Sequence, residues 1–302
     1  MSGEAENRLA GTVAATMKIN QQTVSWLQVA PLAVVLVIFF GIPMIFVAAV
    51  SFFDYARWQM IPTFIFDNYV ELFESNLTLR LYLTAIKYTA IVWAITFVVG
   101  FTVAYFLVFH VRSLTLKIGL FLVCTVPFWT SNIIRMISWI PFLGRHGVFN
   151  SALMDLGIVQ EPLSFLLFSD FAVIIAYVHL NTLFMIVPIF NSMARIDPGI
   201  LEAAHDAGAS RWRVITDVVL PLSKTGIALG SIFIITLVMG DFFVVKIMSG
   251  GQSATVVSAL STEISSLQYP PAAASAVVLV VIVALMVAAI LRLVDVRREL
   301  TG

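Results

Sequence analysis

Residues 272–292 read AAASAVVLVVIVALMVAAILR and contain no charged side chain before Arg292. A helix of about 20 apolar residues is long enough to cross the roughly 30 Å hydrocarbon core of a bilayer. Five similar blocks precede this one, at about 27–53, 83–109, 116–140, 165–190 and 226–247. Because each block is continuously apolar rather than alternating, helices are expected and a barrel is excluded. The sequence predicts an all-α polytopic membrane protein with six transmembrane helices.

The composition of the whole chain agrees with this class. Of 302 residues, 60% are hydrophobic and 11% charged, and the mean hydropathy is +1.00. A soluble domain carries about 25% charged residues, because its surface must be hydrated. The formal net charge is zero, so no basic arm or stripe suggests a nucleic-acid partner. Cys124 is the single cysteine, which excludes a disulfide or a cysteine metal site within the chain.

The distribution of basic residues predicts the orientation. With six spans both termini lie on one side, and that side would hold 11 of the 17 basic residues. These are Arg8, Lys18, Arg112, Lys117, Arg195, Arg211, Arg213, Lys224, Arg292, Arg297 and Arg298. The positive-inside rule then places both termini in the cytoplasm. We expect a cytoplasmic segment at 1–25 and a transmembrane domain at 26–302, because the first block is too long for a signal peptide.

The longest cytoplasmic connection, 191–225, has the pattern of a structured element. Asp197 suits a helix N-cap, Pro198 the first helical position and Gly208 a left-handed exit. Ser210 suits the N-cap of a second helix, which Pro221 is expected to interrupt. Helices this short are marginal alone in water, so they must pack on the membrane helices, on a partner, or on both.

The spacing within this connection resembles the EAA loop of ATP-binding-cassette (ABC) importer permeases. The matching residues are Glu202-Ala203-Ala204, Gly208 and Val218-Val219-Leu220-Pro221, with Val218 where the family has isoleucine. Over residues 115–295 the resemblance is strongest to permeases of the polyamine, opine and phosphonate group, above all the spermidine/putrescine type. Three further stretches carry it: Val126-Pro127-Phe128-Trp129-Thr130, Gly240-Asp241-Phe242 and Ser249-Gly250-Gly251.

The resemblance implies a type I (MetI-like) importer permease fold in a bacterial inner membrane. It implies four kinds of partner: a related but non-identical second permease, two cytoplasmic ATP-binding subunits, a periplasmic substrate-binding protein, and membrane lipid. ATP and Mg²⁺ would bind to the ATPase subunits, so this chain is expected to be non-catalytic, with no cofactor or metal of its own. The implied contacts with the ATPase are Glu202, Ala203, Ala204, Gly208, Leu220 and Pro221.

Polar residues inside apolar blocks are candidates for the substrate path. Asp241 lies in the outer half of the fifth block, and Arg135 in the outer half of the third, with Phe128 and Trp129 nearby. A carboxylate beside aromatic faces is suited to an alkylammonium cation. An ion pair of Asp241 with Arg135 or Lys246 that only holds helices together is the alternative.

Other assignments receive less support from the sequence. His179 is the one histidine in the middle of a block, and we expect a helix–helix hydrogen bond there rather than a ligand. A membrane enzyme is disfavoured, because paired histidines and a Walker A glycine loop are absent. A secondary transporter is disfavoured, because such folds usually contain repeats and about ten spans. Spermidine or putrescine is the expected substrate, with opines, other organic cations and phosphonates as alternatives.

Overall fold

The computed structural model describes residues 21–56 and 59–294. Most of the segment predicted at 1–25, and the basic residues Arg57, Arg297 and Arg298, lie outside these ranges.

The first half of the described chain is helical apart from one small hairpin. Its elements are α2 (Gln21–Leu36), a π-helical turn (Val37–Gly41), α3 (Ile42–Val50), β1 (Asp54–Ala56), β2 (Gln59–Ile61), α4 (Asp67–Glu74), α5 (Asn76–Tyr105), a π-helical turn (Phe106–His110), α6 (Leu114–Thr125), a 3-10 turn (Val126–Trp129), α7 (Asn132–Leu143) and α8 (Val148–Asp155). The two strands pair antiparallel, with Asp54 opposite Ile61.

The second half is also helical. Its elements are a 3-10 turn (Ser164–Leu166), α9 (Asp170–Met193), α10 (Pro198–Asp206), α11 (Arg211–Arg213), a π-helical segment (Val214–Val219), α12 (Leu220–Leu222), α13 (Lys224–Met239), α14 (Phe243–Met248), α15 (Val256–Ser265) and α16 (Tyr269–Leu293).

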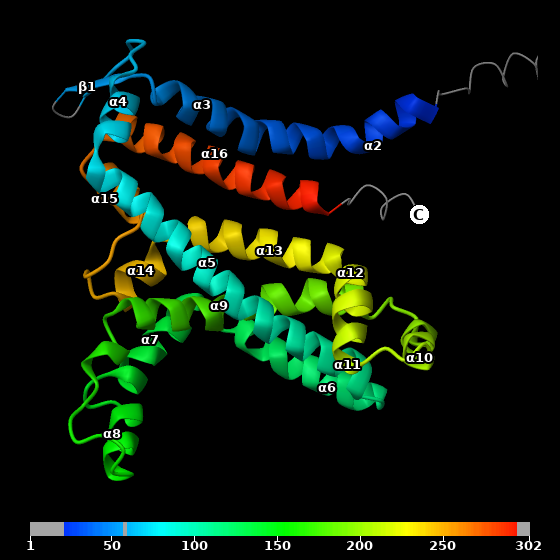
Figure 1. The fold of residues 1–302 in the computed structure, drawn as a ribbon. Helices are drawn as coiled ribbons and strands as arrows, with labels where there is room; N and C mark the ends of the chain where they lie inside the picture. Colours follow the sequence, from blue (N-terminus) through cyan, green and yellow to red (C-terminus); the bar gives the residue numbers. More distant parts are fainter. Residues whose placement is uncertain (1–20, 57–58, 295–302) are drawn as a thin grey trace, which may run out of the picture.

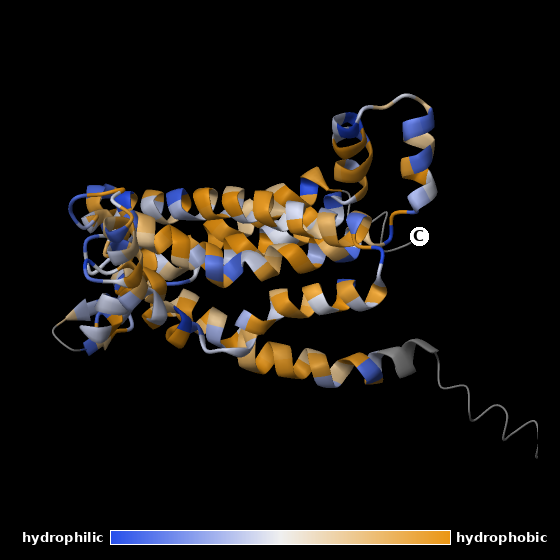
Figure 2. Ribbon diagram, turned by 90° about the horizontal axis from the view of Figure 1, so that it is seen from below, coloured by the Kyte–Doolittle hydropathy of each residue, from blue (hydrophilic) through white to orange (hydrophobic). Residues whose placement is uncertain are grey.

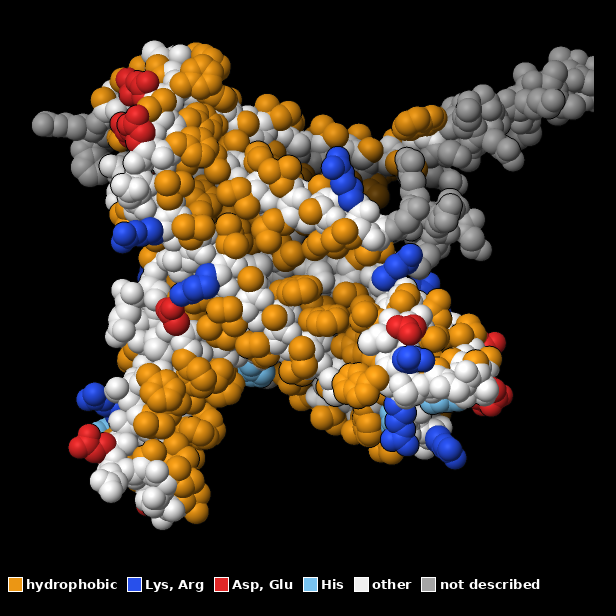
Figure 3. All heavy atoms as spheres, viewed as in Figure 1, with side chains coloured by type: hydrophobic (Ala, Val, Ile, Leu, Met, Phe, Trp, Pro, Cys, Tyr) orange, Lys and Arg blue, Asp and Glu red, His pale blue; other side chains and the backbone are white. Residues whose placement is uncertain are grey.

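The long helices run between two ends of the molecule (Figure 1). One end, called the hairpin end here, carries the β1–β2 hairpin, α4, α14 and α15. The other, called the α10 end, carries α10–α12 and also the start of α2 and the end of α16. Hydrophobic residues dominate the helices between these ends (Figure 2), and the charged side chains on the visible face gather toward them (Figure 3). This is the distribution expected of a bundle whose middle lies in lipid.

Within the described residues, four helices are long and apolar enough to cross a membrane. They are Trp26–Val50, Asn76–His110, Asp170–Met193 and Tyr269–Leu293. Two further stretches qualify only as bent pairs: Leu114–Trp129 with Asn132–Asp155, bent by 91°, and Arg211–Leu222 with Lys224–Met239, bent by 70°. The structure therefore agrees with a multi-pass helical protein, and the count of six spans stays a prediction.

The third predicted span, 116–140, is not one helix. The chain leaves the helical conformation at Thr130 and Ser131, whose ψ angles are 150° and 138°. Pro127 contributes to the break, because it lacks a backbone N–H and its ring crowds the preceding turn. Hydropathy does not register the break, since apolar residues lie on both sides of it. Arg135, predicted in the outer half of this span, lies in α7, after the bend.

The fifth predicted span, 226–247, is also interrupted. Helix α13 ends at Met239, and α14 begins at Phe243. Gly240 follows the last helical residue, as expected for a residue that loosens the helix. Asp241 therefore lies in a short non-helical connection rather than inside a continuous span.

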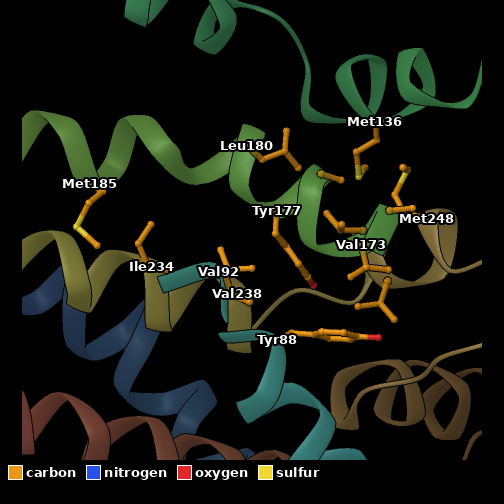
Figure 4. Packing of buried hydrophobic residues seen from close by; sticks show 14 of the residues in the cluster. Tyr88, Val92, Met136, Val173, Tyr177, Leu180, Met185, Ile234, Val238 and Met248 are labelled. Atoms are coloured by element: carbon orange, nitrogen blue, oxygen red, sulfur yellow. The ribbon is translucent and has the colours of Figure 1, made fainter. Parts of the chain in front are cut away.

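The core forms where α5, α9 and α13 pack together. Tyr88 and Val92 from α5 meet Tyr177 from α9 and Ile234 from α13, and all four side chains are at most 1% exposed (Figure 4). Gly226 and Gly230, one turn apart on α13, lie against α9. Small residues at this spacing let two helices approach closely where lipid supplies no hydrophobic drive.

The Gly226 contact predicts a sharp cost for one added methyl group. A Cβ at position 226 would lie 2.3 Å from the carbonyl oxygen of Pro188 and 2.6 Å from Cβ of Ser192. Because a backbone carbonyl in a helix cannot move aside cheaply, Gly226→Ala should destabilise the bundle by about 1–3 kcal/mol. Thermal unfolding of the purified protein in detergent measures this.

The matched control is Gly119→Ala in α6. A Cβ at Gly119 meets no atom within 4 Å, and alanine favours the helix, so the melting temperature should stay equal or rise slightly. Equal melting temperatures for Gly226→Ala and the unchanged protein would contradict the close contact.

Candidate functional site

The connection at the α10 end contains the two capped helices that the sequence predicts. Asp197 caps α10, because its Oδ1 accepts a hydrogen bond from the Gly199 N–H at 2.8 Å. Gly208 leaves the helix with φ of +81°, the left-handed region that glycine enters at little cost. Ser210 caps the next helix by accepting from the Arg213 N–H at 3.4 Å.

Only part of the apolar face of α10 packs against the helix bundle. Leu201 and Ala204 pack against the main core, whereas Ala203 is exposed and Ile200 is 45% exposed. Trp212, at the start of the second helix, is 76% exposed. We call five of the exposed residues of this connection the α10 surface: Ile200, Glu202, Ala203, Gly208 and Trp212. It presents apolar side chains and a carboxylate that nothing in the described chain covers.

The second helix departs from its predicted form. Pro221 does not interrupt it, because the helix continues to Leu222 and the break falls at Ser223. A π-helical segment, Val214–Val219, precedes the proline and buries Val214 and Val219, five positions apart. The side chains of Leu220 and Pro221 stay exposed beside it.

A small cavity lies at the opposite end of α13, around Asp241. It holds about 110 Å³ and is lined by Phe128, Asn132, Tyr177, Leu180, Asn181, Phe184, Leu237, Asp241 and Val244. The lining therefore combines one carboxylate, two amides and three aromatic rings. Of the predicted path residues, Asp241 and Phe128 meet here.

Asp241 is half-buried and well supported. Its Oδ1 accepts from the Val244 N–H at 2.8 Å and from the Tyr177 hydroxyl at 3.2 Å. Within the described residues, the one ion pair is Lys87–Asp170, so Asp241 pairs with neither Arg135 nor Lys246. The ion pair that was the alternative for Asp241 does not form in this structure, and the carboxylate lines the cavity.

The aromatic residues that were predicted to line the path behave differently from each other. Phe128 lines the Asp241 cavity and packs edge-on against Phe184, with ring centroids 5.0 Å apart. Trp129 is 77% exposed and lines none of the cavities described here, so it does not join Asp241. Adjacent residues in a 3-10 turn point in different directions, which separates the two rings.

Arg135 lies on the other side of Phe128. It is 8% exposed, and its guanidinium carbon is 5.9 Å from the centre of the Phe128 ring. Its Nη2 donates to Oδ1 of Asn132. Arg135 lines two cavities, of about 330 and 390 Å³, together with His179. His179 accepts a hydrogen bond from the Trp139 indole N–H at 3.1 Å, which confirms the helix–helix hydrogen bond expected for it.

Two polar residues of the Asp241 cavity were not predicted from the sequence: Tyr177 and Asn132. Tyr177 and Asn181 lie one helical turn apart on α9, and this spacing beside the mid-block His179 was the available signal. Asn132 gave no signal of its own, because only the bend before α7 brings it toward Asp241. No cluster of three or more metal-ligating side chains occurs in residues 21–56 and 59–294.

A separate cluster of polar side chains forms hydrogen bonds between elements at the hairpin end. Asp170, at the start of α9, accepts from Lys87 Nζ at 2.7 Å and from the Tyr88 hydroxyl at 2.5 Å. The Ser253 hydroxyl donates to the same carboxylate at 2.6 Å. The cluster therefore fixes the loop between α14 and α15 onto α5 and α9.

Comparison with known proteins shows which family the chain is similar to. No protein-family model matches the chain. The spermidine/putrescine transport system permease protein PotB of Haemophilus influenzae is 32% identical over 249 residues, covering 82% of this chain and 85% of the relative. The spermidine/putrescine transport system permease protein PotC of Escherichia coli is 33% identical over 67 residues, covering 22% of this chain and 25% of that relative.

A solved structure shares the fold. It is that of a bacterial alginate ABC transporter in complex with an alginate pentasaccharide-bound periplasmic protein, with a TM-score of 0.68 and 17% identity. The match covers 90% of this chain and 94% of the matched chain. The chain is 32% identical to PotB, has the EAA-type spacing at 202–221 and shares the importer fold. It therefore belongs to the ABC importer permeases, in the group of the spermidine/putrescine transport system permeases.

Proposed function

We propose that this permease subunit works in an ATP-driven importer and passes a polyamine such as spermidine or putrescine into the cytoplasm. In this proposal the chain crosses the bacterial inner membrane six times with both termini inside. A periplasmic binding protein delivers the substrate at the hairpin end, and two ATPase subunits act at the α10 end. ATP and Mg²⁺ bind to those subunits, and this chain has no cofactor and catalyses no reaction.

The α10 surface carries the proposal. A connection between two spans needs only a few polar residues, yet this one builds two capped helices and holds Ala203, Ile200 and Trp212 away from the bundle. Exposed apolar residues with a carboxylate among them favour a protein partner. Ala203 allows a close backbone approach, and Glu202 offers an acceptor to a basic or backbone donor on the ATPase.

The path from this surface to the Asp241 cavity supports a mechanical role. The chain runs from α10 through α11 and α12, bends by 70° at Ser223, and continues as α13 to Gly240. The 16 residues of α13 span about 24 Å at 1.5 Å per residue. A displacement of α10 by closing ATPase subunits would therefore reach Asp241 through one rigid helix, opening the cavity alternately to each side.

Four observations support the substrate class. Asp241 supplies a negative charge with no ion-pair partner among the described residues. Phe128, Phe184 and Tyr177 surround it with aromatic faces, and these attract alkylammonium groups. The PotB relative is named for spermidine and putrescine. The two amides, Asn132 and Asn181, offer acceptors for further ammonium hydrogens.

Opines, other organic cations and phosphonates remain the alternatives for the same machinery. A calorimetric titration of the cognate binding protein with putrescine, spermidine, opines and phosphonates separates them. Binding of an opine or phosphonate, with no heat from either polyamine, would overturn the substrate assignment and leave the importer mechanism in place.

The mechanism is tested in proteoliposomes that contain this chain, a related second permease and the ATPase. Uptake of labelled putrescine should require ATP on the α10 side and loaded binding protein on the other. Uptake that continues without the ATPase would instead indicate a secondary transporter.

The first prediction from the proposed function concerns Glu202. Glu202→Lys reverses an exposed charge at the proposed contact, so it should reduce both uptake and co-purified ATPase to less than a tenth. The amount of protein in the membrane should stay unchanged, because Glu202 makes no contact that holds the bundle together. Glu161→Lys, an exposed acid on the loop after α8, should leave ATPase binding intact. Normal ATPase recovery with Glu202→Lys would contradict the docking role.

The second prediction uses Gly208. A side chain there meets no atom of this chain within 4 Å, and aspartate tolerates the left-handed backbone, so Gly208→Asp should fold. Uptake should nevertheless be abolished, because the partner occupies that space. Gly157→Asp is the matched control, since Gly157 has φ of +68° and equally open surroundings. If both variants retain the ATPase and full uptake, the space beside Gly208 is solvent.

The third prediction separates the charge of Asp241 from its structural hydrogen bonds. Asp241→Asn keeps an acceptor for the Val244 N–H and the Tyr177 hydroxyl but removes the charge. A hydrogen bond to a charged group is worth about 1.5–3 kcal/mol, so uptake of a polyamine should fall roughly 10- to 100-fold. Tyr177→Phe keeps the charge and should have the smaller effect. Unchanged uptake with Asp241→Asn, at equal membrane levels, would remove Asp241 from the path.

A further inference from the structure

Arg135 has an incomplete set of partners in this chain. Its side chain is 8% exposed, and its Nη2 donates to Asn132. The Nε atom is buried and has no hydrogen-bond partner among the described residues. A guanidinium at membrane depth is costly unless a counter-charge or a hydrogen-bonding partner accompanies it. Arg135 therefore requires a group that residues 21–56 and 59–294 do not supply.

His179 offers a second donor to the same space. Because its Nδ1 accepts from the Trp139 indole N–H at 3.1 Å, the neutral imidazole carries its proton on Nε2. His179 and Arg135 together line the cavities of about 330 and 390 Å³. One cavity lies between α6 and α9, and the other lies along α7.

No acid balances these donors. Neither cavity is lined by an aspartate or a glutamate. The hydroxyls of Thr130, Ser138 and Thr182 donate to carbonyl groups three or four residues earlier in the chain. Asp241 belongs to the separate cavity beyond Phe128 and forms no ion pair with Arg135. The two cavities thus present donors and a positive charge, which is the complement of a carboxylate.

The backbone beside these cavities also lacks cover. The break between α6 and α7 leaves Thr130 and Ser131 non-helical, and both are exposed. Irregular backbone does not face lipid within the hydrocarbon region, and it is tolerated only against protein or a water-filled cavity. Thr130 itself lines the larger cavity with Arg135. In the proposed function, the second permease is the protein surface that covers this part of the molecule.

We infer that a carboxylate side chain of the second permease chain enters these cavities and pairs with Arg135, with the His179 Nε2–H as its second donor. The inference rests on the proposed function, which supplies the second permease. A transported substrate would fill the site only briefly, whereas the buried guanidinium needs its counter-charge throughout the transport cycle. A resident protein carboxylate meets that need, and its chain covers the exposed break at the same time.

The test traps the pair covalently in the assembled transporter. Arg135→Lys keeps the positive charge and introduces a primary amine, which condenses with a carboxylate activated by the membrane-soluble dicyclohexylcarbodiimide. The amide forms with loss of the carboxylate oxygen to the urea by-product. We expect a product that joins the two permease chains, mapped by mass spectrometry to an acid in a membrane helix of the partner. Arg135→Gln has no amine and should give less than a tenth of it.

Lys87 and Asp170 provide the internal control. Their charged atoms lie 2.7 Å apart, so an amide within this chain should form in every variant and show that the reagent reaches carboxylates. If that amide forms and no product joins the chains, the inference is overturned. An amide from position 135 to Asp241 overturns it as well. If no second permease co-purifies with the unchanged chain, the proposed function itself fails instead.

A charge exchange gives an independent readout once the acid is mapped. Arg135→Glu should reduce uptake at least tenfold, and replacement of the mapped acid by arginine in the same transporter should restore at least half. Failure of the exchange to restore uptake, with both chains at normal levels in the membrane, would contradict a direct pair. Charge-exchange rescue is specific to a contact, because two purely structural defects add.

Discussion

The close contact of α13 with α9 is the constraint on which both candidate sites depend. Gly226 and Gly230 bring α13 onto the carbonyl of Pro188 and onto Met185, where no side chain larger than hydrogen fits without displacement. This contact fixes the direction of α13, whose first residue follows the α10–α12 connection and whose last residue precedes Gly240 and Asp241. In a bilayer such packing is a main source of helix association, because lipid is as apolar as the helices. The α10 surface and the Asp241 cavity are therefore held at opposite ends of one rigid element.

Two polar residues of the Asp241 cavity lie where helices end. Asp241 follows α13, and its Oδ1 accepts from the Val244 N–H at the start of α14, so the carboxylate satisfies a donor that a helix start leaves free. Asn132 begins α7 directly after the Thr130–Ser131 break. The continuous helix α9 adds Tyr177, Asn181 and Phe184 through its side chains. The two interruptions thus bring the carboxylate and one of the two amides to a cavity in a chain with 11% charged residues.

The structural features that were predicted correctly from the sequence depend on residues that are close together in the chain. The caps at Asp197 and Ser210 and the left-handed Gly208 follow from side-chain and backbone chemistry within a few positions, and the structure contains all three. Asp241 was selected because a charge is unusual inside an apolar block. Phe128 was selected because an aromatic face suits a cation. Hydropathy did not locate the break before α7, because it averages across Pro127 and Ser131. Without that bend, Trp129 seemed equivalent to Phe128, and Asn132 and Tyr177 had no reason to meet Asp241.

Three features that the described chain leaves unsatisfied lie in different places. Ala203 and Trp212 at the α10 end, the exposed backbone at Thr130, and the orphan Nε of Arg135 each cost free energy in a chain by itself. Each is also of a different type: exposed apolar side chains, a non-helical break between two apolar helices, and a buried charge. A single partner of one chemistry cannot relieve all three. In the proposed assembly an ATPase covers the first, and a second membrane chain that brings a carboxylate relieves the other two. The unsatisfied groups of this chain therefore support a proposal with at least two kinds of neighbour.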